Sequence, residues 1–398
     1  MLQQQSIIMI LRSVAVRALE WRARWFSDPV DRLQFLQRNV SAPRNSRRRW
    51  RRVLEQMPAL VITLGLAVVV VGLFSTSARH VTAAAGPVVV ARAKRTANPT
   101  VMRATAEPLT NVWLVKNTPQ FDLYSNGLRI ENQFTAATEP RRYLAFARSR
   151  TGTSNWLTDP MGIVFHTTES HIAPFEEDQN QVLQRAGEGL LEYVNRTRAY
   201  HFVIDRFGRV FRVVRESDYA NHAGNSVWAD DSWVYINLNQ SFFGVAFEAQ
   251  SASAETSLPV TAAQVHAGRI LTEMLRARYA IIAANCITHA QVSVNPGNLR
   301  AGYHVDWAAN LPFGELGLAD NYQRPLPSVT MFGFQADAAL IEKGGASLVR
   351  GIDTSEAQVH RDAILLGQPV EAYRKTLQKR YRDAIRALRG NAAPQEYN

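Results

Sequence analysis

Apolar and polar residues are arranged in a way that predicts strands and helices in turn between residues 156 and 322. The unbroken apolar run MGIVFH (161–166) is typical of a strand that is buried on both faces. Apolar residues recur at helical spacing from Phe175 to Asn195 without an internal proline, which predicts a helix. Strands that alternate with long helices indicate an α/β fold, with a mixed central β-sheet flanked by helices.

The second half of this segment repeats the alternation. The stretches YHFVID (200–205) and RVFRVV (209–214) predict a hairpin, because Gly208 between them can adopt the positive φ of a tight turn. SFFGVAFEAQ (241–250) predicts a further strand, and TAAQVHAGRILTEMLRARYA (261–280) predicts a long helix. The expected order is strand, helix, hairpin, strand and helix, followed by a loop that carries histidines.

One uncharged stretch sets the N-terminal region apart. Residues 59–78 contain no charged side chain and are long enough to cross a bilayer, and the basic cluster RRRWRR (47–52) precedes them. The positive-inside rule then places the arginine-rich arm, residues 1–58, in the cytoplasm and the main domain in the periplasm. We therefore predict an uncleaved single-pass anchor in the inner membrane. A cleaved signal peptide is the alternative, because STSA (75–78) has the small residues of a cleavage site.

Other segments flank the main domain at 156–322, and their composition differs from it. The expected segments are a linker at 79–110, a β-hairpin lead-in at 111–155 and a C-terminal extension at 323–398. The lead-in alternates apolar and polar residues around the turn Ser125-Asn126-Gly127. The extension begins with a proline-containing stretch that we read as a linker, and it ends in a strongly basic helix from Val370. We expect this helix to pack on the domain surface or to face an anionic wall polymer or a partner.

The net charge of +11 changes this picture little, because most of it lies in the arm. Residues 1–58 hold twelve arginines, no lysine and four acidic residues, so they carry +8 of the total. The main domain therefore gives no reason to expect a nucleic-acid partner. The single cysteine, Cys286, excludes an intramolecular disulfide framework and a multi-cysteine metal site, and its apolar neighbours predict a buried position.

Histidines mark the candidate chemistry. His166 ends the buried strand and further histidines follow on a distant loop, an arrangement by which a fold can assemble a metal site from separate segments. Short motifs that occur in a fixed order then carry a family resemblance: FHTTES, YHFVIDRFGRVFRVV, ANHAGNS, FFGVAFEAQ, and ITH with VDW. From Gly162 to about Leu318 the chain resembles the zinc-dependent N-acetylmuramoyl-L-alanine amidases of the type-2 amidase and peptidoglycan recognition protein superfamily.

The resemblance implies a Zn²⁺ site with three protein ligands. His166 matches the first ligand of the family and His289 matches the second. The family places an Asp or Cys soon afterwards as third ligand, but residues 290–303 contain no Asp, Glu, Cys or His. The next candidates are His304 and Asp306. Asp306 corresponds to a position at which the last helix of the family begins and would act as its cap, so His304 is the expected third ligand and Asp306 the alternative.

Further matches imply catalytic and substrate-binding residues. Tyr200 matches a tyrosine that family members place beside the metal, with packing at a strand edge as the alternative. Some members use a glutamate where this chain has Ala246. Glu248, two residues further on the same side of the strand, is the candidate substitute, with a salt-bridged or strand-end glutamate as the alternative. The residues expected to contact substrate are His222, Asn221, Asn225, Trp228 and Arg300.

Together these matches predict a zinc enzyme that cleaves the amide bond between N-acetylmuramic acid and the L-alanine of the stem peptide. Its partners would be peptidoglycan or muropeptides, and the N-terminal anchor would attach it to the membrane. The departures at the third ligand and at Ala246 leave other interpretations open. These are a non-catalytic peptidoglycan-binding sensor or scaffold with the same fold, and a zinc amide hydrolase with a different substrate.

Overall fold

The computed structural model describes residues 111–148, 154–251 and 260–390. The arginine-rich arm, the predicted anchor at 59–78 and the predicted linker at 79–110 lie outside these ranges. Within them, no helix combines the length and the apolar character needed to cross a membrane.

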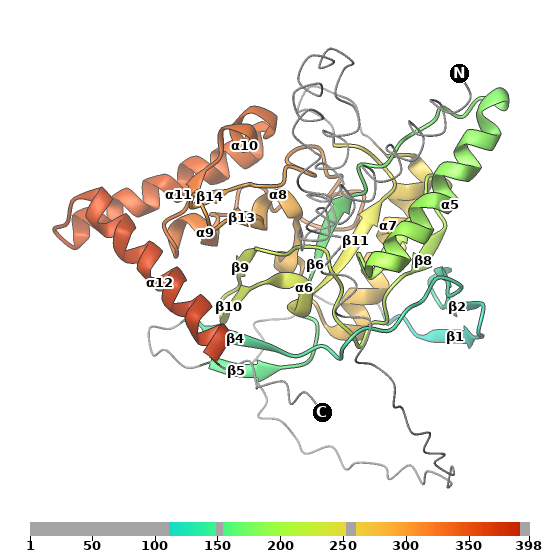
Figure 1. Ribbon diagram of the computed structural model, residues 1–398, viewed down its shortest axis with the longest axis horizontal. Helices are drawn as coiled ribbons and strands as arrows, with labels where there is room; N and C mark the ends of the chain where they lie inside the picture. Colours follow the sequence, from blue (N-terminus) through green and yellow to red (C-terminus); the bar gives the residue numbers. More distant parts are fainter. Residues whose placement is uncertain (1–110, 149–153, 252–259, 391–398) are drawn as a thin grey trace, which may run out of the picture. The chain divides into compact units, whose positions relative to one another are not determined.

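A mixed sheet forms the centre of the described chain (Figure 1). Strands β7, β11, β6 and β12 are mutually parallel, whereas β1 with β2, β2 with β3 and β7 with β8 pair antiparallel. The spatial order is β1 (Leu114–Asn117), β2 (Phe121–Tyr124), β3 (Arg129–Glu131), β8 (Val210–Arg212), β7 (Phe202–Ile204), β11 (Phe242–Phe247), β6 (Gly162–Thr167) and β12 (Cys286–Thr288). The predicted α/β fold with a mixed central sheet flanked by helices is therefore confirmed.

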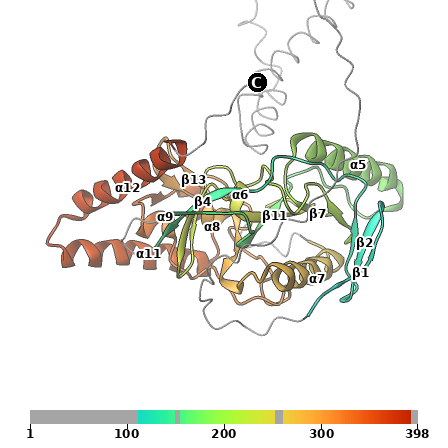
Figure 2. The same cartoon turned by 90° about the horizontal axis from the view of Figure 1, so that it is seen from below.

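Two long helices cover opposite faces of this sheet (Figure 2). Helix α7 (Ala262–Tyr279) begins at a capping box and packs on the face that carries Phe165. Helix α5 (Asn180–Thr197) packs on the other face, which carries Ala246. Because neighbouring residues of a strand point to opposite faces, His166 lies on the same face of the sheet as α5.

A second, antiparallel sheet was not predicted. Its strands are β5 (Ser154–Leu157), β4 (Tyr143–Ala147), β10 (Trp233–Ile236) and β9 (Val227–Ala229). The expected hairpin around Gly127 is present as β2 and β3, but β3 also pairs in parallel with β8. The lead-in therefore extends the central sheet as well as packing against the domain, and β5 runs across the expected boundary at residue 155.

The C-terminal region belongs to the same core as the sheet. Residues 323–328, which we expected to be a linker, are packed in part, with Leu326 and Ser328 buried. The basic stretch forms the expected helix α12 (Val370–Gly390), whose Leu377 and Tyr381 join the main apolar cluster. The remaining elements are η1 (Glu177–Gln179), α6 (Leu238–Ser241), η2 (Ala283–Asn285), α8 (His289–Val292), β13 (Val294–Asn295), β14 (Arg300–Ala301), α9 (Pro327–Thr330), β15 (Gln335–Ala336), α10 (Ala338–Lys343) and α11 (Ala346–Leu365).

Candidate metal centre

Three buried side chains meet near the carboxyl ends of the parallel strands β6 and β12. His166 lies near the end of β6, His289 directly follows β12, and Asp306 comes from the loop after β14. The pairing of Thr288 with Phe165 sets His289 beside His166. One ligand atom from each of the three residues lies within 4.8 Å of the others. Parallel pairing thus joins segments that are far apart in the sequence.

The Asp306 carboxylate lies between the two imidazole rings. Its Oδ2 is 3.1 Å from Nδ1 of His166, and its Oδ1 is 2.9 Å from Nδ1 of His289. Burial alone would raise the pKa of the Asp306 carboxyl. The charge of His289 and the hydrogen bond with His166 outweigh burial, however, and hold this pKa well below its usual range. The carboxylate is therefore ionised at neutral pH.

The chemistry of this cluster fits a metal ion. Both ring nitrogens of His289 are buried and lack a hydrogen bond to any described group, although Nδ1 is close to Asp306. Buried polar atoms in folded proteins nearly always have a partner. A metal ion held by these three side chains would give one ring nitrogen of His289 a partner, and two imidazoles with a carboxylate are a common donor set for divalent transition metals. His166, His289 and Asp306 are therefore the described residues best placed to hold a metal.

The geometry favours Asp306 over His304 as the third ligand, against our expectation. We set Asp306 aside as a helix cap, but no helix begins there, and the chain makes turns around a positive φ at Trp307. His304 is buried with its ring stacked on His289, at 4.6 Å between centroids, and it is not part of the cluster of ligand atoms. A hydrogen bond from the His304 amide to Ser293 Oγ fixes the backbone at this position.

A hydrogen bond with His222 orients the ring of His166. Its Nδ1 lies 3.1 Å from Nε2 of His166, and its Nε2 lies 3.2 Å from the carbonyl oxygen of Phe242. A carbonyl can only accept, so Nε2 of His222 carries the hydrogen and Nδ1 accepts one from His166. Burial and the charge of His166 hold the pKa of His222 well below its usual value, which keeps this ring neutral. This contact holds the His166 ring with Nδ1 on the side of Asp306, where a bound metal ion would take the place of the Nδ1 hydrogen.

Tyr200 packs against the ring of His166. The two ring centroids are 5.1 Å apart, and Tyr200 is almost fully buried. Its φ of 63° lies in the left-handed region, which is costly for a residue with a side chain. Such strained positions are concentrated at functional sites. The placement agrees with a role beside the metal.

Residues 156–298 match the family described as N-acetylmuramoyl-L-alanine amidase. This segment belongs to that family. The match includes His166, Tyr200, His222 and His289 and confirms the family and the enzyme class expected from the sequence. It ends before Asp306, so the third candidate ligand lies outside the matched segment. No curated protein matches the sequence significantly.

Similar solved structures also come from amidases. The amidase LysC from Clostridium intestinale URNW is 19% identical, with 46% of this chain and 93% of that chain covered and a TM-score of 0.25. AmpDh3 from Pseudomonas aeruginosa, in complex with an anhydromuramic pentapeptide, is 21% identical, with 49% and 76% covered and a TM-score of 0.31. AmiD from E. coli, in complex with its substrate, is 17% identical, with 51% and 89% covered and a TM-score of 0.32.

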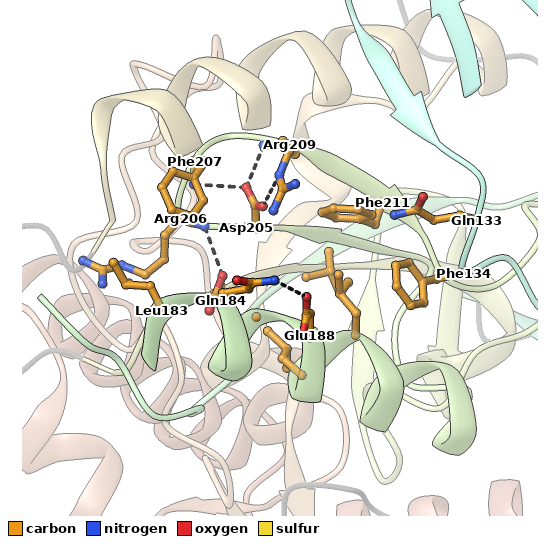
Figure 3. A pocket seen from close by; sticks show the side chains of 15 residues that line it. Gln133, Phe134, Leu183, Gln184, Glu188, Asp205, Arg206, Phe207, Arg209 and Phe211 are labelled. Atoms are coloured by element: carbon orange, nitrogen blue, oxygen red, sulfur yellow. Dashed lines mark hydrogen bonds and ion pairs between the residues drawn. The ribbon is translucent and has the colours of Figure 1, made fainter. Parts of the chain in front are cut away.

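Glu248 of the amidase domain lies in a different pocket from the metal cluster. This pocket, of about 420 Å³, lies between α5 and the β7–β8 hairpin, and none of the three candidate ligands lines it (Figure 3). The Glu248 carboxylate accepts a hydrogen bond from the Arg206 amide at 3.1 Å, and burial raises its pKa. Ala246, rather than Glu248, pairs with His166 across the sheet. The geometry therefore does not place Glu248 where a catalytic partner of the metal is needed.

The other expected substrate contacts are scattered. Trp228 is buried and donates from Nε1 to Asn285, which makes it a core residue rather than the wall of an open groove. His222 is buried and contacts Nε2 of His166, as described above. Asn221 donates to the Thr197 carbonyl, Asn225 is exposed beside β13, and Arg300 donates to the Ala336 carbonyl.

The orienting role of His222 was missed in the sequence, although one residue signalled it. Gly244 interrupts the apolar strand β11, and a glycine inside a buried strand often marks a close approach of another group. A Cβ at position 244 would lie 2.5 Å from Cγ of His222. The glycine is therefore needed to seat the histidine ring against the strand.

Replacing the carboxylate should separate the two candidates for the third ligand. We expect Asp306→Asn to lose most of the bound metal, because the amide removes the negative charge between the histidines. His304→Gln should retain it. Metal content per protein, measured by inductively coupled plasma mass spectrometry on the two purified variants, checks this. Loss of metal in His304→Gln alone would reverse the assignment.

Removing the imidazole of His222 should weaken metal binding without abolishing the site. We expect His222→Phe to lower metal affinity by about 10–100-fold, the usual effect of losing a residue that orients a ligand. The measurement is the chelator concentration that strips half of the metal. The exposed His171→Gln serves as a matched control and should behave as wild type. Equal affinity in His222→Phe and wild type would rule out the orienting role.

Proposed function

We propose that this protein is a zinc-dependent peptidoglycan amidase that cleaves between N-acetylmuramic acid and the L-alanine of the stem peptide. The observation that carries the proposal is the buried cluster of His166, His289 and Asp306, seated largely within a segment of the amidase family. Two imidazoles and one carboxylate are a usual ligand set for catalytic zinc, because a fourth position stays available for water or substrate.

The zinc ion, when bound, would lower the pKa of a water molecule and polarise the amide carbonyl of the substrate. The protein groups around it have separate tasks. Asp306 supplies the negative charge between the two histidines, and His222 fixes the ring orientation of His166. Tyr200 is the side chain beside His166 with a hydroxyl that can donate a hydrogen bond. We assign it the stabilisation of the negative charge that develops on the carbonyl oxygen.

One observation favours a second candidate, a peptidoglycan-binding sensor or scaffold without turnover. Ala246 pairs with His166 across the sheet, at a position where some family members carry a glutamate. The nearby Glu248 is engaged with the Arg206 amide instead. A domain of this kind could bind peptidoglycan and a metal ion yet move protons poorly.

Digestion of purified sacculi distinguishes the two candidates. We expect the full chain, in detergent with zinc, to release stem peptides that begin with L-alanine, identified by mass spectrometry. Asp306→Asn should release none, and the exposed His171→Gln should release as much as wild type. Tyr200→Phe should lower kcat more than it changes KM, because its hydroxyl acts on the transition state. Binding of zinc and sacculi without any release would support the sensor instead.

We further propose that residues 59–78 anchor the protein in the inner membrane, with the amidase domain in the periplasm. The support is the uncharged run itself and the arginine cluster in front of it. A reporter enzyme that works only outside the cytoplasm, fused after Thr105, should be active. Activity of a cytoplasm-only reporter at the same position would contradict this topology and exclude wall peptidoglycan as the substrate.

A further inference from the structure

Three consecutive aliphatic side chains face solvent at the connection between α11 and α12. Ile364, Leu365 and Leu366 are 74%, 83% and 51% exposed. The chain reverses at Gly367, whose φ is positive, and α12 then returns beside α11. The connection is thus the outer tip of a helical hairpin (Figure 2). A contiguous patch of exposed apolar side chains often marks a surface that binds another protein, a membrane or a ligand.

One face of α12 carries a row of basic side chains. Its members recur at intervals of four and three residues, which places them on a single side of the helix: Lys375, Lys379, Arg382, Arg386 and Arg389. All five are exposed, whereas Tyr373, Leu377 and Tyr381 are buried on the opposite side. We call this row the basic stripe. Asp383 pairs with Lys379 at 2.7 Å and with Arg386 at 2.9 Å, so one carboxylate offsets part of the charge.

We propose that the α11–α12 hairpin docks on an anionic membrane surface. The aliphatic tip enters the boundary between headgroups and acyl chains, and the basic stripe lies against the lipid phosphates. Interfacial helices combine these two features, since apolar burial and attraction to anionic lipids act together. A nucleic acid or an anionic polymer would pair with the charges of the basic stripe but would leave Leu365 exposed to water. A second copy of this chain would cover the tip but would bring another basic stripe toward the first.

The proposal does not depend on amidase activity. It concerns a surface that none of His166, His289 and Asp306 lines, and it stands whether or not the chain turns over substrate. It also differs from the proposed anchor, which would tether the chain from its other end. The run at 59–78 would, however, bring α12 into the neighbourhood of a bilayer. Because that run could bind vesicles by itself, the test must report the local position of the tip.

The experiment places an environment-sensitive fluorophore at the tip of the full chain. The labelled site is Leu365→Cys, and the native Cys286 is fully buried, so an unreactive wild type verifies selective labelling. The protein is added to vesicles of phosphatidylcholine whose acyl chains carry bromine as a quencher. These vesicles are prepared with or without phosphatidylglycerol. We expect quenching of the tip fluorophore only with phosphatidylglycerol, and its loss at high salt, because salt screens charge pairs at a surface.

Charge neutralisation tests the stripe separately. The variant Lys375→Gln/Arg382→Gln/Arg389→Gln leaves the Asp383 pairs intact and should abolish the quenching. The matched control removes three exposed charges elsewhere, Arg185→Gln/Arg269→Gln/Lys343→Gln, and should retain it. A fluorophore at exposed Gln181→Cys on α5 should stay unquenched throughout. Equal quenching in both lipids, or none, would overturn the proposal, as would self-association that shields the tip without lipid.

Discussion

The site depends on an ionised carboxylate that is buried between two imidazole rings. Asp306 approaches Nδ1 of His166 and Nδ1 of His289 within about one hydrogen-bond length each. Removing one partner from a buried charge cluster costs about 3–5 kcal/mol, because the remaining charge is left uncompensated. The ring nitrogens of His289 have no hydrogen-bond partner within the described chain. A cation would give this ring the partner that it lacks, and for this reason the cluster is the candidate metal centre.

The loop that carries this carboxylate is fixed by the C-terminal region. The Tyr322 hydroxyl donates to the Trp307 carbonyl at 2.8 Å, and the Trp307 ring packs on Phe247 of β11 at 5.7 Å. Gly302 lies so close to Leu340 of α10 that a Cβ there would come within 2.5 Å of it. The family match ends at residue 298, yet the third candidate ligand depends on packing beyond it. The C-terminal extension thus packs against the loop that carries the third candidate ligand.

The predictable part of the site consists of His166 on strand β6 and His289 directly after strand β12. His166 could be found because a buried apolar strand ends in a histidine, and its family match supplied the role. His289 was assigned only by its match to the second ligand of the family, on what we expected to be a loop, and the structure places it directly after the short strand β12. Asp306 was misjudged because its match to the start of the family's last helix made it a cap, whereas the chain forms a turn at this position and no helix begins there. The hydrophobic pattern likewise predicted the central sheet but not the sheet of β5, β4, β10 and β9, whose short strands come from two segments that are far apart in the chain.

The sequence by itself determined the fold class, the family and two of the candidate ligands. These features arise from local patterns, since the period of apolar residues and short ordered motifs are written along the chain. Only the tertiary structure decided that Asp306 rather than His304 completes the cluster, that His222 orients His166, and that Glu248 belongs to another pocket. Each of these depends on the distance between side chains from separate strands and loops. Parallel pairing and the packing of the C-terminal helices set that distance, and no spacing along the chain encodes it.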